Sequence, residues 1–312
     1  MNRHSKRAWT SLLAVGSVVA LAACGSSSSS TSSATSSAAT SNGTITEVFG
    51  TAPDSLDPGM AYTTQALEPD QVVYTPLLGY AHVAGAAGGK LIAGLATALP
   101  TISSDGKTYT LTLRKGLKYS NGTTVMASDF QASIERDFKI DSPGVGFFGN
   151  IVGASEFAKT KTGHITGIVT NNSTGKITIT LTSPQGDFSN ILATEFAALL
   201  PASTPAKDQS TTPAPSTGPY MIQSYTPNKT IVEVRNPNFD ASLFGGNVPV
   251  GNPDKVVWDI IGDDNVALQR VISGQDDCSG ITRSRRTASP RCSRSIRIRS
   301  SCSRRRTRTT SS

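Results

Sequence analysis

The side chains that carry out covalent or metal chemistry are few in this sequence of 312 residues, and their spacing matches no familiar catalytic arrangement. His4 lies in a basic N-terminal stretch, while His82 and His164 are isolated, and no HExxH or CxxC motif accompanies them. A metal site with recognisable ligand spacing is therefore not expected. No GxSxG motif is present to expose a nucleophilic serine. These observations predict a protein that is not an enzyme and that has no cofactor, no catalytic residue and no metal.

Two weaker patterns could be mistaken for catalytic sites. Residues 84–91 (AGAAGGKL) resemble a phosphate-binding loop, but Ala84 stands at the first glycine position and Leu91 replaces the hydroxyl residue that would hold Mg²⁺. We interpret this segment as a flexible loop. Asp129 and Glu135 fall in a predicted helix, as an N-terminal charge and a solvated surface residue rather than an acid–base pair.

The N-terminal segment has the features of an export signal. Three basic residues precede an apolar, uncharged run over residues 8–23, which is too short to span a bilayer comfortably. Residues 21–25 (LAACG) resemble the bacterial lipoprotein signal, which implies cleavage after residue 23 and lipidation of Cys24. The alternative is an ordinary signal peptide that happens to contain a cysteine. Either way, we expect a signal peptide over residues 1–23.

A tether is predicted between this signal and the folded part of the protein. Residues 24–43 consist almost entirely of Ser, Thr, Ala and Gly and carry no charge. Such a stretch cannot bury enough apolar surface to offset the entropy lost on ordering, so we expect it to be flexible. A lipid, a tether and a folded body together predict an extracytoplasmic protein that is anchored to the cell membrane, at the cell surface or in the periplasm.

Charge is distributed in blocks, so the overall net charge of +7 is misleading. Residues 24–277 hold all 22 acidic residues against 15 Lys and Arg, a net charge of −7. This mildly acidic body does not favour nucleic-acid binding. Because Cys24 is the only cysteine before residue 278, a disulfide framework within the body is excluded.

Strands and helices are interspersed through the body, which predicts a mixed α/β fold. Alternating apolar residues predict strands at 108–114, 177–181 and 256–261, and a hairpin of 220–225 with 230–235. Helical periodicity predicts helices that begin at Ser128 and that cover 188–200 and 266–272. The first of these helices is expected to start with a capping box of Ser128 and Gln131.

An ordered set of short motifs resembles the family 5 extracellular solute-binding proteins, the peptide- and nickel-type receptors of ABC importers. Any one motif is weak, but the set follows the family's order over residues 44 to about 277, which makes it specific. The motifs are 57–64 (DPGMAYTT), 74–78 (YTPLL), 104–109 (SDGKTY), 113–116 (LRKG), 121–122 (NG), 127–130 (ASDF), 216–220 (STGPY), 235–237 (RNP), 254–258 (DKVVW) and 273–275 (SGQ).

The resemblance implies a type II periplasmic-binding-protein-like α/β fold, in which two lobes close on a ligand and the closed form docks onto permease subunits of an ABC importer. Residues 44–277 would be the first lobe with its inserted subdomain, and the second lobe would be missing. The implied ligand is an oligopeptide, although nickel complexes, sugars and other small solutes share this scaffold.

The resemblance also indicates where a ligand would bind. In peptide-binding relatives the stretch after the Asp-Pro motif passes beside the peptide backbone, which points to Tyr62, Thr63 and Thr64 as ligand-binding residues. Their hydroxyl and backbone groups could pair with the amides of a peptide. The alternative is that Tyr62 is a packing residue and that the two threonines form an ordinary loop.

Residues 278–312 depart from the family. They hold 11 Arg and 10 Ser, no acidic residue and no periodicity, and such a segment cannot build a core. One interpretation is a disordered basic tail, through which a surface lipoprotein binds anionic polymers or lipids. The other is translation out of frame, which the abrupt change favours. In that case we expect weak or no ligand binding, because important anchors for the peptide termini lie in the missing lobe.

Overall fold

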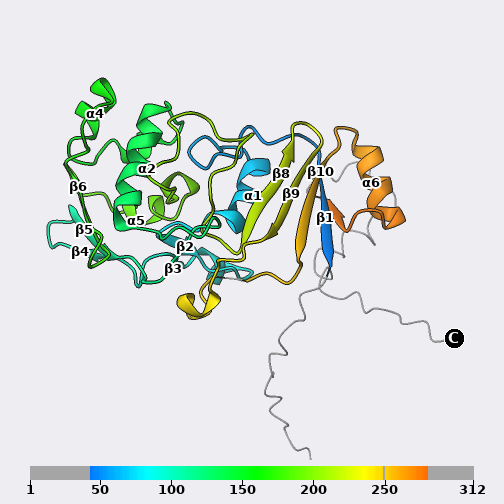
Figure 1. Ribbon diagram of the computed structural model, residues 1–312, viewed down its shortest axis with the longest axis horizontal. Helices are drawn as coiled ribbons and strands as arrows, with labels where there is room; N and C mark the ends of the chain where they lie inside the picture. The colour runs from blue at the N-terminus through cyan, green and yellow to red at the C-terminus, as the bar shows by residue number, and fades with distance from the viewer. Residues whose placement is uncertain (1–42, 249, 280–312) are drawn as a thin grey trace, which may run out of the picture. The chain divides into compact units, whose positions relative to one another are not determined.

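The computed structural model describes residues 43–248 and 250–279. The predicted signal peptide, Cys24, residues 24–42 of the tether and residues 280–312 of the tail lie outside this part. The described residues form three β-sheets, with helices beside them (Figure 1). The mixed α/β fold predicted from the sequence is therefore confirmed.

The largest sheet has the strand order β11-β1-β10-β9-β8. β1 (Thr44–Phe49) lies between β10 (Lys255–Ile260) and β11 (Cys278–Ser279) and runs parallel to both. β9 (Thr230–Arg235) pairs antiparallel with β10 and with β8 (Tyr220–Thr226), which forms the predicted hairpin. Because β11 pairs with β1, the folded part continues past residue 277, where we expected the tail to begin.

The second sheet is antiparallel throughout and has the order β4-β5-β7-β6. Its strands are β4 (Thr101–Ile102), β5 (Thr108–Thr112), β7 (Lys176–Thr180) and β6 (Ile168–Asn171). Tyr109 and Leu111 of β5, with Ile177 and Ile179 of β7, are buried in the core, as the alternating sequence predicts. A separate two-stranded sheet joins β2 (Leu78–Tyr80) to β3 (Leu91–Ala93), and the predicted loop at 84–91 contains the short 3₁₀ helix η1 (Ala86–Gly89).

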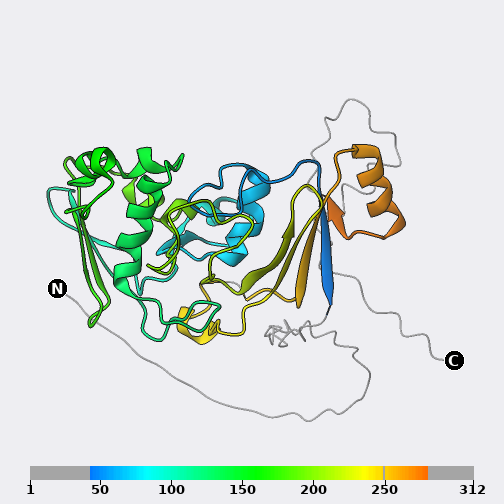
Figure 2. The ribbon, with the colours of Figure 1, turned by 45° about the horizontal axis from the view of Figure 1, so that its top comes forward.

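Helices of very different lengths surround these sheets. The longer ones are α1 (Thr64–Val73), α2 (Ala127–Lys139), α4 (Ala154–Thr160) and α6 (Asp264–Ser273). The short ones are α3 (Val145–Phe148), α5 (Phe188–Ile191), η2 (Glu195–Ala197) and η3 (Ala241–Phe244). Figures 1 and 2 both show α1 on the β8 side of the largest sheet and α6 beyond β1. None of the helices in the described ranges is both long and apolar enough to cross a bilayer.

The start of α2 differs from the prediction. The Oδ2 atom of Asp129 accepts a hydrogen bond from the backbone N–H of Met126 at 2.8 Å, while the N–H of Ser128 donates to Asn172. The predicted capping box of Ser128 and Gln131 is therefore wrong, and Asp129 does the capping. Phe130, Ile134 and Phe138, which recur every four residues along α2, form a buried apolar stripe, as expected for the face of a helix that packs on a core.

The helix predicted over 188–200 is also wrong beyond its first turn. Thr194 adopts an extended backbone conformation (φ −89°, ψ 158°), and after η2 the chain is extended again at Ala198, which bridges to Pro76. Leu192, Leu199 and Leu200 are all buried nonetheless. An apolar run in a core can be satisfied without a helix, and periodicity alone does not distinguish the two cases.

Candidate ligand-binding site

The loop that precedes α1 is held in place by the carboxylate of Asp54. Its Oδ1 atom accepts hydrogen bonds from the Thr63 hydroxyl at 2.7 Å and from the Thr63 N–H at 3.2 Å, and its Oδ2 atom accepts one from the Tyr62 N–H at 3.0 Å. The carbonyl of Asp57 accepts hydrogen bonds from Met60 and Ala61, each at 2.8 Å. These bonds fix the main chain up to the point where α1 begins.

The structure separates the three predicted ligand residues into two groups. Tyr62 is 61% exposed, and its ring contacts Phe196 with a centroid separation of 6.2 Å. Thr64 is exposed, and no described residue hydrogen-bonds its hydroxyl. Thr63 is the N-cap residue of α1, and its hydroxyl donates a hydrogen bond to the carboxylate of Asp54. The side chains of Tyr62 and Thr64 are therefore exposed, whereas the Thr63 hydroxyl holds the loop.

A buried ion pair connects this loop to α2. The carboxylate of Asp57, from the Asp-Pro motif, is fully buried and pairs with the guanidinium of Arg136 on α2. Sequence reasoning assigned no role to Arg136. At about 100° per residue, Arg136 lies on the side of α2 opposite the stripe of Phe130, Ile134 and Phe138, so periodicity predicts exposure and carries no signal for its burial.

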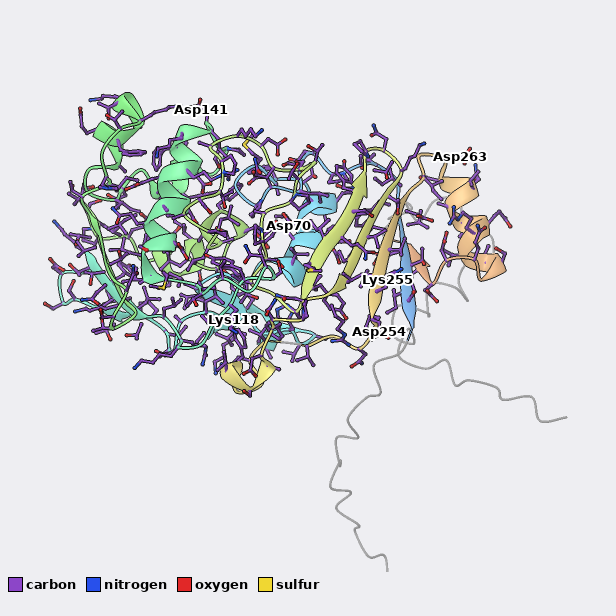
Figure 3. All side chains as sticks on the ribbon, viewed as in Figure 1. Asp70, Lys118, Asp141, Asp254, Lys255 and Asp263 are labelled. Carbon is purple, nitrogen blue, oxygen red and sulfur yellow. The ribbon has the colours of Figure 1, made fainter. Side chains whose placement is uncertain are left out.

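Acidic side chains are buried around α1. Asp70 on α1 (Figure 3) and Glu233 on β9 are both fully buried, and no described residue hydrogen-bonds their carboxyl oxygens with good geometry. Burial raises the pKa of Asp70 well above its ordinary value, and nearby acidic groups raise it further. Burial also raises the pKa of Glu233 to about 8, although the indole N–H of Trp258 opposes this shift. In both cases the interior disfavours the charged form of the carboxyl group.

Glu135 corrects another expectation. We predicted a solvated surface residue, but its side chain is buried and its Oε1 atom accepts a hydrogen bond from the backbone N–H of Ile165 at 3.0 Å. The Nδ1 atom of His164 lies 3.1 Å from the same carboxylate. Glu135 thus joins α2 to the chain that leads into β6. His164 is exposed and belongs to this structural contact.

A small hollow lies near the C-terminal end of α1, and its lining includes Gln71, Tyr80, His82, Pro219 and Val248. It is mainly apolar and lies at the opposite end of α1 from Tyr62. Within the described ranges, no group of three or more His, Cys, Asp or Glu is arranged to hold a metal ion.

Comparison with known families identifies the chain. The model of the bacterial extracellular solute-binding proteins, family 5, matches residues 90–288. This chain belongs to that family. The match extends beyond residue 277, in agreement with the position of β11 in the largest sheet. The family is one of solute-binding proteins rather than enzymes.

Individual relatives agree with this assignment. The chain is 30% identical over 183 residues to the glutathione-binding protein GsiB of Salmonella choleraesuis, which covers 56% of this chain and 31% of that protein. It is 32% identical over 128 residues to the oligopeptide-binding protein OppA of Bacillus subtilis, which covers 40% of this chain and 22% of that protein.

Solved structures give the same fold. The clavulanic acid biosynthesis oligopeptide binding protein 2 matches with a TM-score of 0.68 at 27% identity, covering 76% of this chain and 43% of that structure. The OppA structure of Burkholderia pseudomallei matches with a TM-score of 0.64 at 23% identity, covering 76% of this chain and 45% of that structure. This family 5 chain thus spans less than half of the length of these structures, and less than a third of the first curated relatives.

Proposed function

We propose that this chain is the ligand-binding component of an ABC importer that captures oligopeptides outside the membrane and delivers them to permease subunits. The observation that carries the proposal is the exposed pair of Tyr62 and Thr64 on a loop that Asp54 and Asp57 hold rigid. Membership in the solute-binding family and the names of the relatives, two of which are called oligopeptide-binding proteins, support peptides as the solute class.

A peptide backbone is the group that these residues suit. The hydroxyls of Tyr62 and Thr64 can each donate and accept a hydrogen bond, so both the N–H and the C=O groups of a peptide find partners. Main-chain recognition of this kind does not depend on the peptide sequence, which a receptor for varied peptides requires. A preorganised loop also reduces the ordering entropy that binding costs.

Ligand-observed saturation-transfer NMR with short peptides at millimolar concentration tests this proposal, because it detects weak binding. We expect the full chain to give transfer signals that weaken in Tyr62→Ala and in Thr64→Ala. Val169→Ala is the control, since Val169 is 62% exposed on β6 and lies outside this loop. The proposal fails if the unaltered chain gives no signal with any peptide, or if both loop variants bind as well as it does.

Affinity is expected to be weak for this polypeptide. Clamp-like receptors gain affinity from contacts on both lobes, and this chain covers 43–46% of several oligopeptide-receptor structures. We therefore expect peptide dissociation constants well above micromolar. Titration calorimetry that shows saturation at micromolar peptide would contradict this expectation.

We also propose that residues 1–23 form a signal peptide and that Cys24 is lipidated, which anchors the folded part to the outer face of the membrane through the tether. Expression of the full chain in a bacterial host with an alkyne-bearing fatty acid tests this directly. The label is expected on the unaltered chain and on Cys302→Ser, and it is expected to be absent from Cys24→Ser. Equal labelling of all three, or labelling of none, excludes the anchor at Cys24.

A further inference from the structure

Three aromatic rings from distant parts of the chain meet next to the candidate site. The ring of Phe196, in η2, lies 6.2 Å from that of Tyr62 and 5.9 Å from that of Phe147, in α3. Phe196 is only 7% exposed, whereas Tyr62 and Phe147 are 61% and 40% exposed. We call Tyr62, Phe147 and Phe196 the aromatic shelf. Two of its rings face solvent, and the third supports both.

Neighbouring residues hold the rings of the aromatic shelf in position. Gly144 packs directly against the ring of Phe196, so closely that a Cβ atom there would overlap the ring. Phe148 is fully buried in the core, which turns its neighbour Phe147 outward at the surface of α3. The carboxylate of Asp54 fixes the backbone of Tyr62. The positions of the rings are therefore set before any ligand arrives.

The chemistry of the aromatic shelf favours an uncharged, flat or bulky partner. Exposed rings lose unfavourable contact with water when an apolar group covers them, and aromatic pairs contribute beyond the area that they bury. Asp54, which binds the main chain at Tyr62, and Glu195, the residue before Phe196, do not offset this preference. Asp54 is engaged by the main chain and the hydroxyl of the loop, and burial raises the pKa of Glu195, next to Phe196, which disfavours its charge.

Tyr62 belongs both to the aromatic shelf and to the loop that, in the proposed function, binds the peptide backbone. A side chain projecting from a backbone held at Tyr62 and Thr64 would therefore lie within reach of the rings. We propose that the aromatic shelf is a side-chain subsite, which makes this protein prefer peptides with an aromatic or large apolar side chain next to that backbone. This inference rests on the proposed peptide-binding function.

The test compares two tripeptides, Ala-Phe-Ala and Ala-Ser-Ala, in ligand-observed NMR titrations against the full chain. We expect the phenylalanine peptide to bind about three- to tenfold more tightly, the range that one aromatic contact supplies. In Phe147→Ala the two affinities are expected to differ by less than about twofold. Phe147→Trp and the remote control Val169→Ala are expected to keep the preference. Far-ultraviolet circular dichroism checks that each variant is folded.

Each outcome is informative. If the unaltered chain binds neither of these tripeptides nor any other short peptide, the proposed function fails and the subsite fails with it. If it binds other short peptides but not Ala-Phe-Ala, only the subsite is excluded. If it binds both equally, or if Phe147→Ala keeps the full preference, peptide binding stands and the subsite is excluded. A second copy of the chain is the competing occupant of the aromatic shelf. Sedimentation that shows a dimer dissociated by Phe147→Ala would exclude the subsite in favour of self-association.

Discussion

The guanidinium of Arg136 binds the carboxylate of Asp57 through two parallel hydrogen bonds, in a place that solvent does not reach. One of them joins Nη1 to Oδ1 at 3.0 Å, and the other joins Nη2 to Oδ2. Arg136 also donates to the carbonyls of Pro205 and Lys207, at 2.8 and 2.7 Å, and Asp57 accepts from the N–H of Gln209 at 2.9 Å. The pair thus ties the Asp-Pro loop, α2 and the 205–209 segment together.

Removal of one partner from this ion pair is expected to be costly. In Arg136→Met the carboxylate of Asp57 stays buried without its counter-charge, so the free energy of unfolding should fall by about 3–5 kcal/mol. Urea denaturation followed by circular dichroism measures the loss. In an Asp57→Asn background the same substitution should cost less, because no buried charge is then left unpaired.

A surface ion pair provides the matched control for this prediction. Lys161 pairs with Asp141, whose side chain is 83% exposed (Figure 3). Solvent screens such pairs, so Asp141→Asn should leave the unfolding midpoint nearly unchanged. Equal losses in Arg136→Met and Asp141→Asn would show that the buried pair has no special role in stability.

Stability is expected to decrease as pH rises, because of Glu233. Its pKa is raised by burial from an ordinary value of 4.5 to about 8 in the folded chain. Below about pH 4.5 both the folded and the unfolded chain keep the proton, and the full contribution to stability is present. Between these two pKa values only the unfolded chain releases it. The free energy of unfolding should therefore fall by up to about 1.4 kcal/mol per pH unit in that range.

Glu233→Gln should flatten this pH dependence, because the amide does not ionise. Part of the slope should remain, since burial also raises the pKa of Asp70 and acts in the same direction. Glu156→Gln, which changes an exposed residue of α4, should leave the slope intact. Urea unfolding at about pH 5 and about pH 8 distinguishes these cases. A slope in Glu233→Gln that equals the slope of the unaltered chain would contradict the prediction.

Gly144 and Gly146 lie close in sequence but should respond in opposite ways to alanine. A Cβ at Gly144 would overlap the Phe196 ring, and the ring can move only by disturbing the aromatic shelf, so Gly144→Ala should destabilise by about 1–3 kcal/mol. A Cβ at Gly146 meets no atom within 4 Å, so Gly146→Ala should be neutral or slightly stabilising within α3. Thermal unfolding compares the two, and similar midpoints would exclude the close contact at Gly144.

Asp54 is expected to control the mobility of the loop before α1. In Asp54→Ala the N–H groups of Tyr62 and Thr63 lose their acceptor, so their hydrogen exchange should become faster. Exchange measured by NMR or by mass spectrometry of peptic fragments reports this locally. Asp105→Ala is the control, because Asp105 accepts from Lys107 in a different turn and should change exchange only there. Unchanged hydrogen exchange at Tyr62 in Asp54→Ala would show that the loop does not need the Asp54 carboxylate to stay in place.

Local sequence patterns predicted several strands and helices correctly. The hairpin of β8 and β9 and the helix α6, which ends at Gly274 with φ 79°, follow the alternation and the stop signal that the sequence shows. The same reasoning failed for residues 188–200, where apolar residues are buried without a helix. It also failed for Glu135, because a charged residue on a predicted helix is exposed by default unless another part of the chain supplies its partner.

For the candidate site, too, the sequence indicated some residues and not others. A family resemblance predicted Tyr62, Thr63 and Thr64 as ligand-binding residues, which stays a prediction, and the structure shows that the Thr63 hydroxyl is bound to Asp54 within the loop itself. Asp54, Phe147 and Phe196 carried no sequence signal for this site. Their roles depend on contacts between residues far apart in the chain, which neither periodicity nor spacing encodes.

The sequence by itself therefore determined the family, the mixed α/β class and the positions of five of the eleven strands in the described ranges, because motifs, alternation and turn residues are local properties. Only the tertiary structure decided that Arg136 pairs with Asp57, that Glu233 is buried with a raised pKa and that Phe196 joins Tyr62 to Phe147. The energy of a buried charge or ring depends on the atoms around it, and those atoms come together only when the chain folds.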